Sequence, residues 1–455
     1  MPQADATAPA ITPADAVVRG WGGGEGAAVS LVRPRDADEL RAALASCGTQ
    51  GAIARGMGRS YGDAAQLSGG LVLETTRLRG FELDPQPGTV TAQGGVTLYE
   101  LLDALVPSGW MVPVVPGTQH VTVGGAIAGD IHGKNHGTAG TFGTHVEALG
   151  LLTSSGEVLE LGPDDDLFAA TLGGMGLTGV ILWARIKLRA ISSSLLSVDI
   201  DRVEDLDGAF AALSARGGPY RVAWLDLLCS RPGRGIVTRA EHIDGGAAAL
   251  HRSWGGATVR SRASVPARWP AGVLRSSTVR AFNELRYRRW PHSARGHVES
   301  IGAHMFPLDA LDSWPRLYGP RGFLQYQLVV PPDRTDVLRT AIEQLRRSRI
   351  PCYLCVLKDF GPSNGAPLSF PIAGWTITLD IPRAAAGLDA LLDRFDELVA
   401  EAGGRVYLSK DVRMGPDALA AMYPRLEEWR SARDGADPER VWRSDLAMRT
   451  GLVPA

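Results

Sequence analysis

The 455-residue sequence lacks the features that would assign it at once to a membrane or secreted class. No window approaches the roughly 20 apolar residues that a membrane-spanning helix needs. The first residues, MPQADATAPAITPADAVV, contain neither a basic start nor a long apolar run, so an ordinary secretory signal is not expected. We therefore expect no signal peptide and no transmembrane span, and we interpret residues 1–19 as a disordered tail rich in Ala and Pro.

Cysteine residues are also few, and the net charge is small. Four cysteines are too few for a disulfide scaffold. Cys352 and Cys355 form a CxxC within a strand-like run, without a second Cys/His pair nearby, so buried strand cysteines are favoured over a zinc or redox site. A net charge of −2 gives no reason to expect a nucleic-acid partner. With 45% apolar and 21% charged residues, the composition is that of an ordinary globular protein.

Glycine, by contrast, is abundant: 55 residues, concentrated before residue 180. One run, residues 124–145, is GGAIAGDIHGKNHGTAGTFGTH. The apolar residues that recur in and before it distinguish it from a Gly/Ser linker. His132 and His136 have the i, i+4 spacing of a helical metal site, but the glycines between them disfavour a helix. We therefore expect no metal here and interpret the run as backbone lying close to a large planar cofactor.

A second glycine-rich loop, ARGMGRSYGDAAQ at residues 54–66, leaves a strand-like run. Successive backbone N–H groups in such a loop form an anion-binding nest, and Arg55 and Arg59 add positive charge. A pyrophosphate would fit this loop. The run GMGLTG at residues 174–179 also satisfies GxGxxG, but it follows a helix-like run and precedes a strand. This order is the reverse of the Rossmann fingerprint, so a Rossmann site is not expected.

The order of elements predicts an α+β fold. Residues 20–195 alternate short strand-like runs, glycine turns and a few helices. Residues 323–408 follow the order β-α-β-β-α-β, the ferredoxin-like unit, which favours an antiparallel sheet covered by helices on one side. The loop between the middle strands of this unit, DFGPSNGAPLSFPIAG, has a length typical of functional loops.

The segment 252–295 carries ten arginines and one acidic residue. Trp254, Trp269 and Trp290 are interleaved with these arginines. One interpretation is a solvated insertion. The other is a basic flap that attracts a phosphate head group or an anionic membrane surface.

These runs carry a family resemblance. The two glycine-rich loops, the second with PGT and TVGGAIA, and the later GGMGLTGVI resemble the FAD-binding domain of the vanillyl-alcohol-oxidase superfamily. Within that superfamily, GDIHGKNH, FLQYQ, FGPSNGAPLSFPIAGW and LSKD resemble the decaprenylphosphoryl-ribose 2′-oxidase family of actinobacterial arabinan synthesis. The resemblance implies a two-domain α+β flavoprotein. Its expected parts are an FAD-binding domain at 20–195, a substrate-binding domain at 196–410, and a C-terminal helical segment at 411–455 that returns to the first domain.

The resemblance also implies a cofactor site, with the FAD pyrophosphate in the loop from Arg55 to Asp63. Arg59 falls near the position where covalent members of the superfamily carry their flavin-linking histidine. Arginine cannot form that bond, so FAD is expected to be bound non-covalently. The expected FAD contacts are Arg55, Gly56, Met57, Gly58, Arg59, Ser60, Tyr61, Gly62, Asp63, Gly117, Thr122, Val123, Gly124, Gly125, Gly129, Asp130, Ile131, His132, Ile181 and Tyr407.

The implied reaction oxidises the 2′-hydroxyl of a polyprenylphosphoryl ribose. A hydride passes to flavin N5, and the hydroxyl proton passes to a base. Lys410 and His132 are the candidate catalytic residues, and which of them is the base stays open. Thr378 stands where the family commonly has a cysteine, so inhibitors that trap a thiol are not expected to bond here. Thr376 stands where the family has an asparagine. The expected substrate-binding residues are Tyr61, Gln327, Lys358, Thr378 and Lys410.

The implied keto sugar would pass to a separate NADH-dependent short-chain reductase, and the two enzymes together would give the arabinose epimer. An alternative is a sugar or alditol oxidase of the same superfamily with a different substrate, such as a secondary metabolite. A flavin-binding protein without catalysis is disfavoured because Lys410 and His132 are both present. The lack of an export signal favours a cytoplasmic or membrane-associated protein, whereas the family implies the cell envelope or periplasm.

Overall fold

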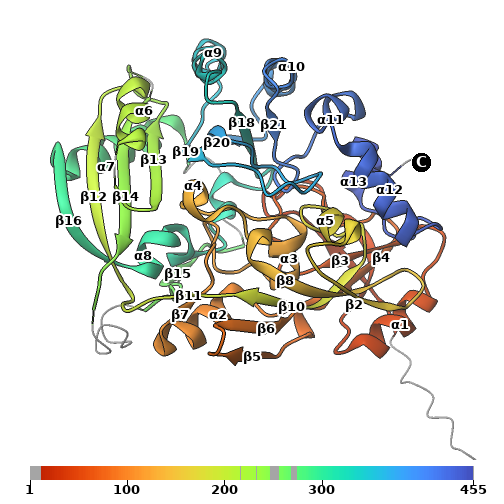
Figure 1. The fold of residues 1–455 in the computed structure, drawn as a ribbon. Helices are drawn as coiled ribbons and strands as arrows, with labels where there is room; N and C mark the ends of the chain where they lie inside the picture. Colours follow the sequence, from red (N-terminus) through yellow and green to blue (C-terminus); the bar gives the residue numbers. More distant parts are fainter. Residues whose placement is uncertain (1–11, 216, 232, 246–255, 268–273, 454–455) are drawn as a thin grey trace, which may run out of the picture.

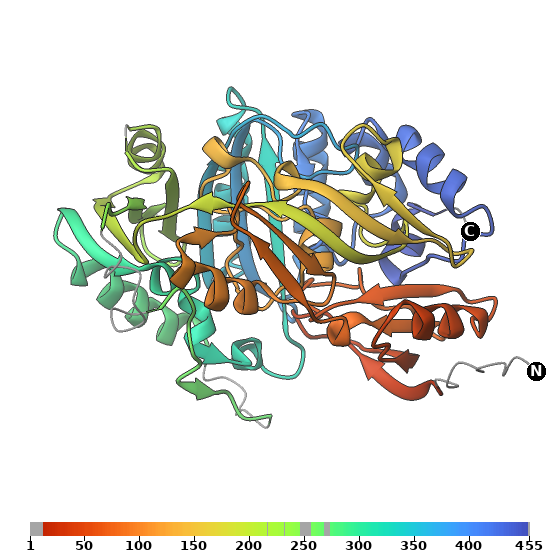
Figure 2. The ribbon, with the colours of Figure 1, turned by 60° about the horizontal axis from the view of Figure 1, so that its bottom comes forward.

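The computed structural model describes residues 12–215, 217–231, 233–245, 256–267 and 274–453. The chain forms an N-terminal sheet, a five-stranded sheet, an eight-stranded sheet and a group of C-terminal helices (Figure 1). In Figure 2 the N-terminal sheet (red) and the C-terminal helices (blue) lie at the same end of the molecule. The strands of residues 195–300 (green) lie at the opposite end.

The N-terminal sheet has the strand order β1-β2-β4-β3. Strand β1 pairs antiparallel with β2, so the expectation of a disordered tail up to residue 19 is wrong for residues 14–18. Alternation explains the strand, because Val18 is buried whereas Val17 points to solvent. Residues 1–11 of the expected tail lie outside the described ranges. The elements are β1 (Ala14–Val18), β2 (Ala27–Val32), α1 (Ala37–Ala45), β3 (Ala52–Arg55) and β4 (Leu71–Glu74).

The five-stranded sheet is antiparallel, with the order β5-β6-β10-β8-β9. Strands β8 and β9 form a hairpin whose turn contains Ser-Ser-Gly. The GxGxxG run lies between α5 and β10, in the predicted helix-to-strand order. The elements are β5 (Phe81–Asp84), β6 (Thr89–Gln93), α2 (Leu98–Leu105), β7 (Trp110–Met111), α3 (Val123–Ala128), α4 (His136–Ala139), β8 (Val146–Leu152), β9 (Val158–Leu161), α5 (Asp166–Thr171), β10 (Val180–Lys187) and β11 (Arg189–Ala190).

The glycine-rich run 124–145 is not extended throughout, because α3 and α4 lie within it. Thr122 caps α3 by accepting a hydrogen bond from the Gly125 amide at 3.1 Å. His132 lies outside both helices and forms a β-bridge with Thr141, whereas His136 begins α4. The two histidines therefore do not share a helical face.

The eight-stranded sheet has the order β16-β12-β14-β13-β19-β20-β18-β21. One face packs on helices α6, α9 and α10 in a large apolar core, and the other face turns toward the five-stranded sheet. The elements are β12 (Leu195–Val203), α6 (Leu206–Ser214), β13 (Tyr220–Asp226), β14 (Arg234–His242), β15 (Ala263–Ser264), α7 (Ser276–Arg289), β16 (Ser293–Ser300), α8 (Ile301–Met305), β17 (Leu311–Asp312), β18 (Phe323–Val330), α9 (Thr335–Ser348), β19 (Leu354–Phe360), β20 (Gly374–Pro382), α10 (Leu388–Glu401) and β21 (Arg405–Val406).

The predicted ferredoxin-like unit is confirmed as β18-α9-β19-β20-α10-β21. Its strands pair antiparallel in the order β21-β18-β20-β19, and Figure 1 shows α9 and α10 on one side of them. The last strand is shorter than expected, since residues 408–410 form a turn. Cys355 lies in β19, whereas Cys352 precedes it; both are buried and free.

Three helices end the chain: α11 (Pro416–Met422), α12 (Leu426–Ala436) and α13 (Asp445–Thr450). The Ala52 amide of β3 donates to the Val441 carbonyl at 2.8 Å, and the Trp429 indole donates to the Ala170 carbonyl at 2.9 Å. Within the described ranges, no helix is long and apolar enough to cross a membrane. Arg252, Trp254, Arg268 and Trp269 of the arginine-rich segment lie outside those ranges.

Candidate functional site

A cavity of about 1070 Å³ lies between the glycine-rich loops and the eight-stranded sheet. This volume slightly exceeds the roughly 300–1,000 Å³ typical of ligand sites, so the cavity has room for a ligand larger than a simple sugar. The expected site residues that line it are Gly56, Met57, Gly58, Arg59, Ser60, Tyr61, Gly117, Thr122, Gly124, Gly125, Gly129, Ile131, His132, Ile181, Lys358, Thr378, Tyr407 and Lys410.

The loop of residues 56–60 has the backbone of an anion-binding nest. Its amides donate no hydrogen bond to any other residue in the described part of the chain. Gly58 has φ +61°, a left-handed conformation that glycine adopts without strain. At Gly56 a Cβ would lie 2.2 Å from the Thr122 hydroxyl, so only glycine lets this loop approach the loop before α3. The arrangement offers consecutive N–H groups to an anion.

The Arg59 side chain forms part of the same wall. Its guanidinium lies 3.7 Å from the centroid of the Trp21 ring, a cation–π contact, and its Nε donates to the His120 carbonyl at 3.3 Å. Burial lowers the pKa of Arg59, although Asp309 opposes this effect. The contacts with Trp21 and His120 hold the positive charge of Arg59 beside the nest.

Six of the expected site residues do not line the cavity and instead support those that do. Arg55 turns away and donates to the carbonyls of Ala65 at 2.8 Å and Arg19 at 2.7 Å. A Cβ at Gly62 would lie 2.0 Å from the Asp411 carbonyl, so this glycine allows close backbone packing. The six residues are Arg55, Gly62, Asp63, Val123, Asp130 and Gln327.

Asp130 fastens the long loop between β19 and β20. Its carboxylate accepts hydrogen bonds from the Gly143 amide at 3.0 Å, the Asn364 amide at 2.9 Å and the Ser369 hydroxyl at 2.5 Å. In the same loop, Phe370 stacks on Tyr407 with 4.8 Å between ring centroids. This loop, whose length is typical of functional loops, does not line the cavity itself but supports Tyr407, which does.

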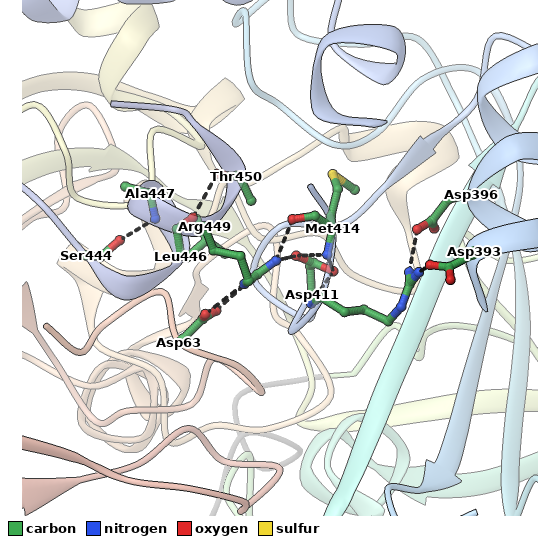
Figure 3. A network of polar contacts seen from close by, with 11 residues as sticks. Asp63, Asp393, Asp396, Asp411, Met414, Ser444, Leu446, Ala447, Arg449 and Thr450 are labelled. Carbon is green, nitrogen blue, oxygen red and sulfur yellow. Dashed lines mark hydrogen bonds and ion pairs between the residues drawn. The ribbon is translucent and has the colours of Figure 1, made fainter. Parts of the chain in front are cut away.

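Asp63 is held by Arg449, near the opposite end of the sequence (Figure 3). The guanidinium forms a bidentate pair with the Asp63 carboxylate, at 2.8 and 3.0 Å. It also donates to Asp411 at 2.8 Å and to the Met414 carbonyl at 2.7 Å. Because Asp411 directly follows Lys410, Arg449 connects the nest loop to the segment that carries Lys410.

A chain of hydrogen bonds determines which nitrogen of His132 carries the proton. Thr376 has one hydroxyl hydrogen and donates it to the Leu328 carbonyl at 2.8 Å, so its oxygen accepts from Gln327 Nε2 at 3.0 Å. The same Nε2 lies 3.0 Å from Nε2 of His132. An amide nitrogen only donates, so His132 Nε2 accepts. The neutral ring therefore carries its proton on Nδ1, which has no partner among the described residues.

The surroundings of His132 keep the ring neutral. Phe360, Phe370 and Tyr407 pack around it at centroid distances of 4.8, 5.6 and 5.2 Å. Burial, followed by the charges of Lys358 and Lys410, holds the pKa of His132 well below its usual value. With its acceptor nitrogen already engaged, His132 is poorly placed to take a proton.

Three lysines line the cavity, and burial is the main cause of the lowered pKa of each. Burial lowers the pKa of Lys410 to about 8, and Asp380 opposes this shift. Burial and the charge of Lys410 lower the pKa of Lys358 to about 7. Burial also lowers the pKa of Lys134 to about 8, although Glu299 opposes it. Amines with such pKa values can bind anions when protonated and accept protons when neutral.

Lys134, Gln325 and Asp380 were not expected from the sequence. Gln325 lines the cavity and donates to Asp380 at 2.6 Å, and burial raises the pKa of this carboxyl to about 7. Period-two alternation could have found two of them, because Gln325 shares a strand face with Gln327 and Asp380 with Thr378. Lys134 has no comparable signal, since it follows His132 in an irregular loop.

Comparison with known proteins gives a consistent picture. Residues 28–162 match the FAD binding domain family. The chain is 40% identical over 448 residues to decaprenylphosphoryl-beta-D-ribose oxidase from Mycolicibacterium smegmatis, covering 95% of this chain and 97% of that protein. It is 38% identical to an uncharacterized protein in the mprA 5′ region of Streptomyces coelicolor, covering 78% and 100%. It is 22% identical to L-gulono-1,4-lactone dehydrogenase from Mycobacterium tuberculosis, covering 94% and 97%.

Proposed function

Because the chain belongs to the family of decaprenylphosphoryl-β-D-ribose oxidases, which are FAD-dependent, we propose that it oxidises the 2′-hydroxyl of a polyprenylphosphoryl ribose to a ketone. The observation that carries the proposal is the convergence of two sets of groups in one cavity. An anion-binding nest at residues 56–60 lies on one wall, and Lys410 and Lys358 lie on another.

The residues present fit FAD. The free amides of residues 56–60 suit a pyrophosphate, and at Gly117 a Cβ would meet no heavy atom within 4 Å, so this backbone opens onto free space. Tyr407 and Gly129 line the middle of the cavity, where the Tyr407 hydroxyl donates to the Gly129 carbonyl at 2.6 Å. When bound, FAD supplies the acceptor for the hydride that leaves the carbinol carbon.

Non-covalent attachment of FAD is part of the proposal. Arg59 lines the cavity at the loop where a flavin-linking side chain would be needed, and a guanidinium does not form that bond. Acid precipitation is expected to release yellow FAD into the supernatant. Flavin that stays with the denatured pellet would refute this part.

Lys410 is the proposed proton acceptor. Its ammonium nitrogen lies 5.6 Å from the centroid of the Tyr61 ring, and its enclosed position favours the neutral amine at mildly basic pH. As the C–H bond breaks, the hydroxyl proton passes to the Lys410 amine, and the alcohol becomes a ketone. His132 orients the sugar rather than taking the proton, because Gln327 already donates to its Nε2.

Anaerobic flavin bleaching tests the function. We expect the visible flavin band to bleach with polyprenylphosphoryl ribose and to persist with free ribose and simple alditols. Bleaching by the free sugars alone would instead favour a sugar or alditol oxidase of the same superfamily. No bleaching by any alcohol would overturn both assignments.

The proposed product and the basic surface suggest two partners. A ketone at C2′ needs a hydride donor for its reduction, so an NADH-dependent short-chain reductase is the proposed next enzyme. The arginine-rich segment, including Arg286, Arg288 and Arg289 at the end of α7, is the proposed contact with an anionic membrane. Co-sedimentation with anionic but not neutral vesicles is expected. Equal binding to both would argue against this contact.

A further inference from the structure

The cavity extends past the lysines over an apolar part of the same sheet face. Across the strands, Gln327 lies opposite Thr378, and Thr378 lies opposite Val356. The row continues from Val356 to Trp224 and from Trp224 to Ile236. The side chains along this row therefore change from amide and hydroxyl groups to apolar groups.

A second row is mostly apolar, with one hydroxyl: Val222 lies opposite Thr238, and Thr238 opposite Ile200. All three residues line the cavity. Neighbouring strands are about 4.8 Å apart, so the apolar floor from β19 to β12 extends about 14 Å. We call this region, together with its roof, the apolar lobe; its residues are Ile200, Val222, Trp224, Ile236, Phe282 and Leu285.

Helix α7 forms the roof of the apolar lobe. Phe282, Leu285, Arg286 and Arg289 line the cavity with the i, i+3, i+4, i+7 spacing of one helical face. Phe282 is 60% exposed and Leu285 is 71% exposed, which is unusual for large apolar side chains that face a cavity. The helix is nevertheless fixed to the sheet, because the buried Asn283 donates to Asp226 at 2.9 Å.

Cationic groups lie at the border of the lobe and on its roof. Lys358, on β19, lies two residues from Val356 and marks the inner border. The backbone of Lys134 lies over β13, where its carbonyl accepts from the Arg221 amide at 2.7 Å, and its ammonium donates to the His304 carbonyl. On the roof, the Arg286 guanidinium lies 5.1 Å from the centroid of the Trp224 ring. A ligand that fills the cavity thus meets polar groups, then lysines, then apolar surface.

We propose that the apolar lobe binds the first isoprene units of the substrate's prenyl chain, while Lys358 and Lys134 bind its phosphate. This proposal rests on the proposed function. The order of groups along the cavity matches the order sugar, phosphate, prenyl chain in such a substrate. A chain seated here would also cover Phe282 and Leu285, which are otherwise left in water.

The dependence of flavin reduction on the length of the substrate's prenyl chain tests whether the apolar lobe binds that chain. The substrates are methyl-, farnesyl- and decaprenylphosphoryl ribose below their micelle concentrations. We expect the wild-type KM to fall at least tenfold from methyl to farnesyl and to change little beyond, because the lobe has room for only a few isoprene units. Phe282→Ser and Leu285→Ser should abolish this gain and leave kcat with the methyl substrate unchanged. Both side chains are already exposed, so these variants should fold normally.

Val298→Ser is the matched control, because Val298 is 54% exposed on β16 but does not line the cavity. If the wild-type KM does not depend on chain length, or if the α7 variants keep the full dependence, the lobe proposal is wrong and the proposed function stands. If no prenylphosphoryl ribose bleaches the flavin, the proposed function itself fails.

A photo-crosslink gives a second readout that does not depend on variants. A diazirine on the first isoprene unit is expected to label α7 or the β13 and β14 strands. Labelling confined to other segments would overturn the assignment.

Discussion

The side-chain amide of Gln327 donates to Nε2 of His132 at 3.0 Å and thereby fixes the tautomer of the histidine. The atom of Gln327 that faces His132 must be the amide nitrogen, because the same atom also faces Thr376. The Thr376 hydroxyl donates its hydrogen to the Leu328 carbonyl and can therefore only accept from Gln327. Gln327 is fully buried beneath the ring, so the pair acts as one rigid unit at the cavity wall. This geometry supports the proposed roles, in which His132 orients the substrate and Lys410 accepts the proton.

Thr376→Val tests this unit. Valine removes the acceptor for Gln327 but keeps the shape of the side chain, so the amide is free to rotate and His132 gains access to both tautomers. Loss of one such hydrogen bond is worth about 1 kcal/mol, or about fivefold in rate. We expect kcat for flavin reduction to fall by about that factor and the ¹⁵N shifts of the His132 ring to move.

Thr376→Ser is the control, since it keeps the hydroxyl and should behave like the wild type. Unchanged ¹⁵N shifts in Thr376→Val would show that the tautomer does not depend on this residue.

The pH profile of flavin reduction tests Lys410. Burial lowers the pKa of Lys410 to about 8, so the amine is protonated below that pH and neutral above it. A base must be neutral to accept a proton, and the rate should therefore rise with pH and level off above about 8. Lys410→Met should lower kcat by about 10²–10⁴-fold and remove the pH-dependent rise.

Lys410→Arg separates proton transfer from charge. Arginine keeps the positive charge but is not deprotonated in this pH range, so this variant should be as slow as Lys410→Met. A fast Lys410→Arg variant would assign an electrostatic role to the lysine.

Substrate affinity should have the opposite pH dependence. In the proposed site Lys358 binds phosphate as the ammonium ion, and burial together with the charge of Lys410 lowers its pKa to about 7. As pH rises through about 7 the free enzyme loses this charge, so KM should rise by up to about tenfold per pH unit while kcat rises. Lys358→Met should raise KM at pH 6 and flatten its pH dependence. A KM for the phosphorylated substrate that is constant from pH 6 to 9 would contradict this role.

Part of this site could be predicted from the sequence because the signals were local. The order β-α-β-β-α-β identified the sheet, and the glycines of residues 56–62 identified the nest loop. The support of that loop could not be predicted, since Asp63 and Arg449 are 386 residues apart and no local pattern links them. Arg55 was expected at the cofactor from its charge and from the family resemblance, and Asp63 from the resemblance alone. In the structure, neighbouring carbonyls and Arg449 satisfy these charges instead.

Arg449→Met tests that support. Breaking its bonds leaves the Asp63 and Asp411 carboxylates without their cation, and Asp411 is buried. Charged hydrogen bonds of this kind are worth about 2–3 kcal/mol, so the free energy of unfolding should fall by about that amount. FAD should also bind more weakly, because the nest loop is released. Calorimetry and fluorescence titration of the apoprotein with FAD measure the two effects.

The control is Arg347→Met, which breaks an exposed pair with Glu343 and should change neither quantity. A variant at Arg449 with wild-type stability and FAD affinity would show that the network in Figure 3 does not support the site.

A substitution at Thr378 tests whether the face of β20 that lines the cavity is accessible to thiol reagents. Thr378 lines the cavity, whereas none of the four native cysteines does; Cys352 and Cys355 are buried in the core, where burial raises the pKa of both thiols. Small alkylating reagents and thiol-trapping inhibitors should therefore leave the cavity of the wild type unmodified.

Thr378→Cys should gain one reactive thiol, detected by mass spectrometry and protected by bound substrate. Labelling of Thr378→Cys that substrate does not slow would place this side chain away from the substrate, and an inhibitor adduct on wild-type Thr378 would contradict the prediction directly.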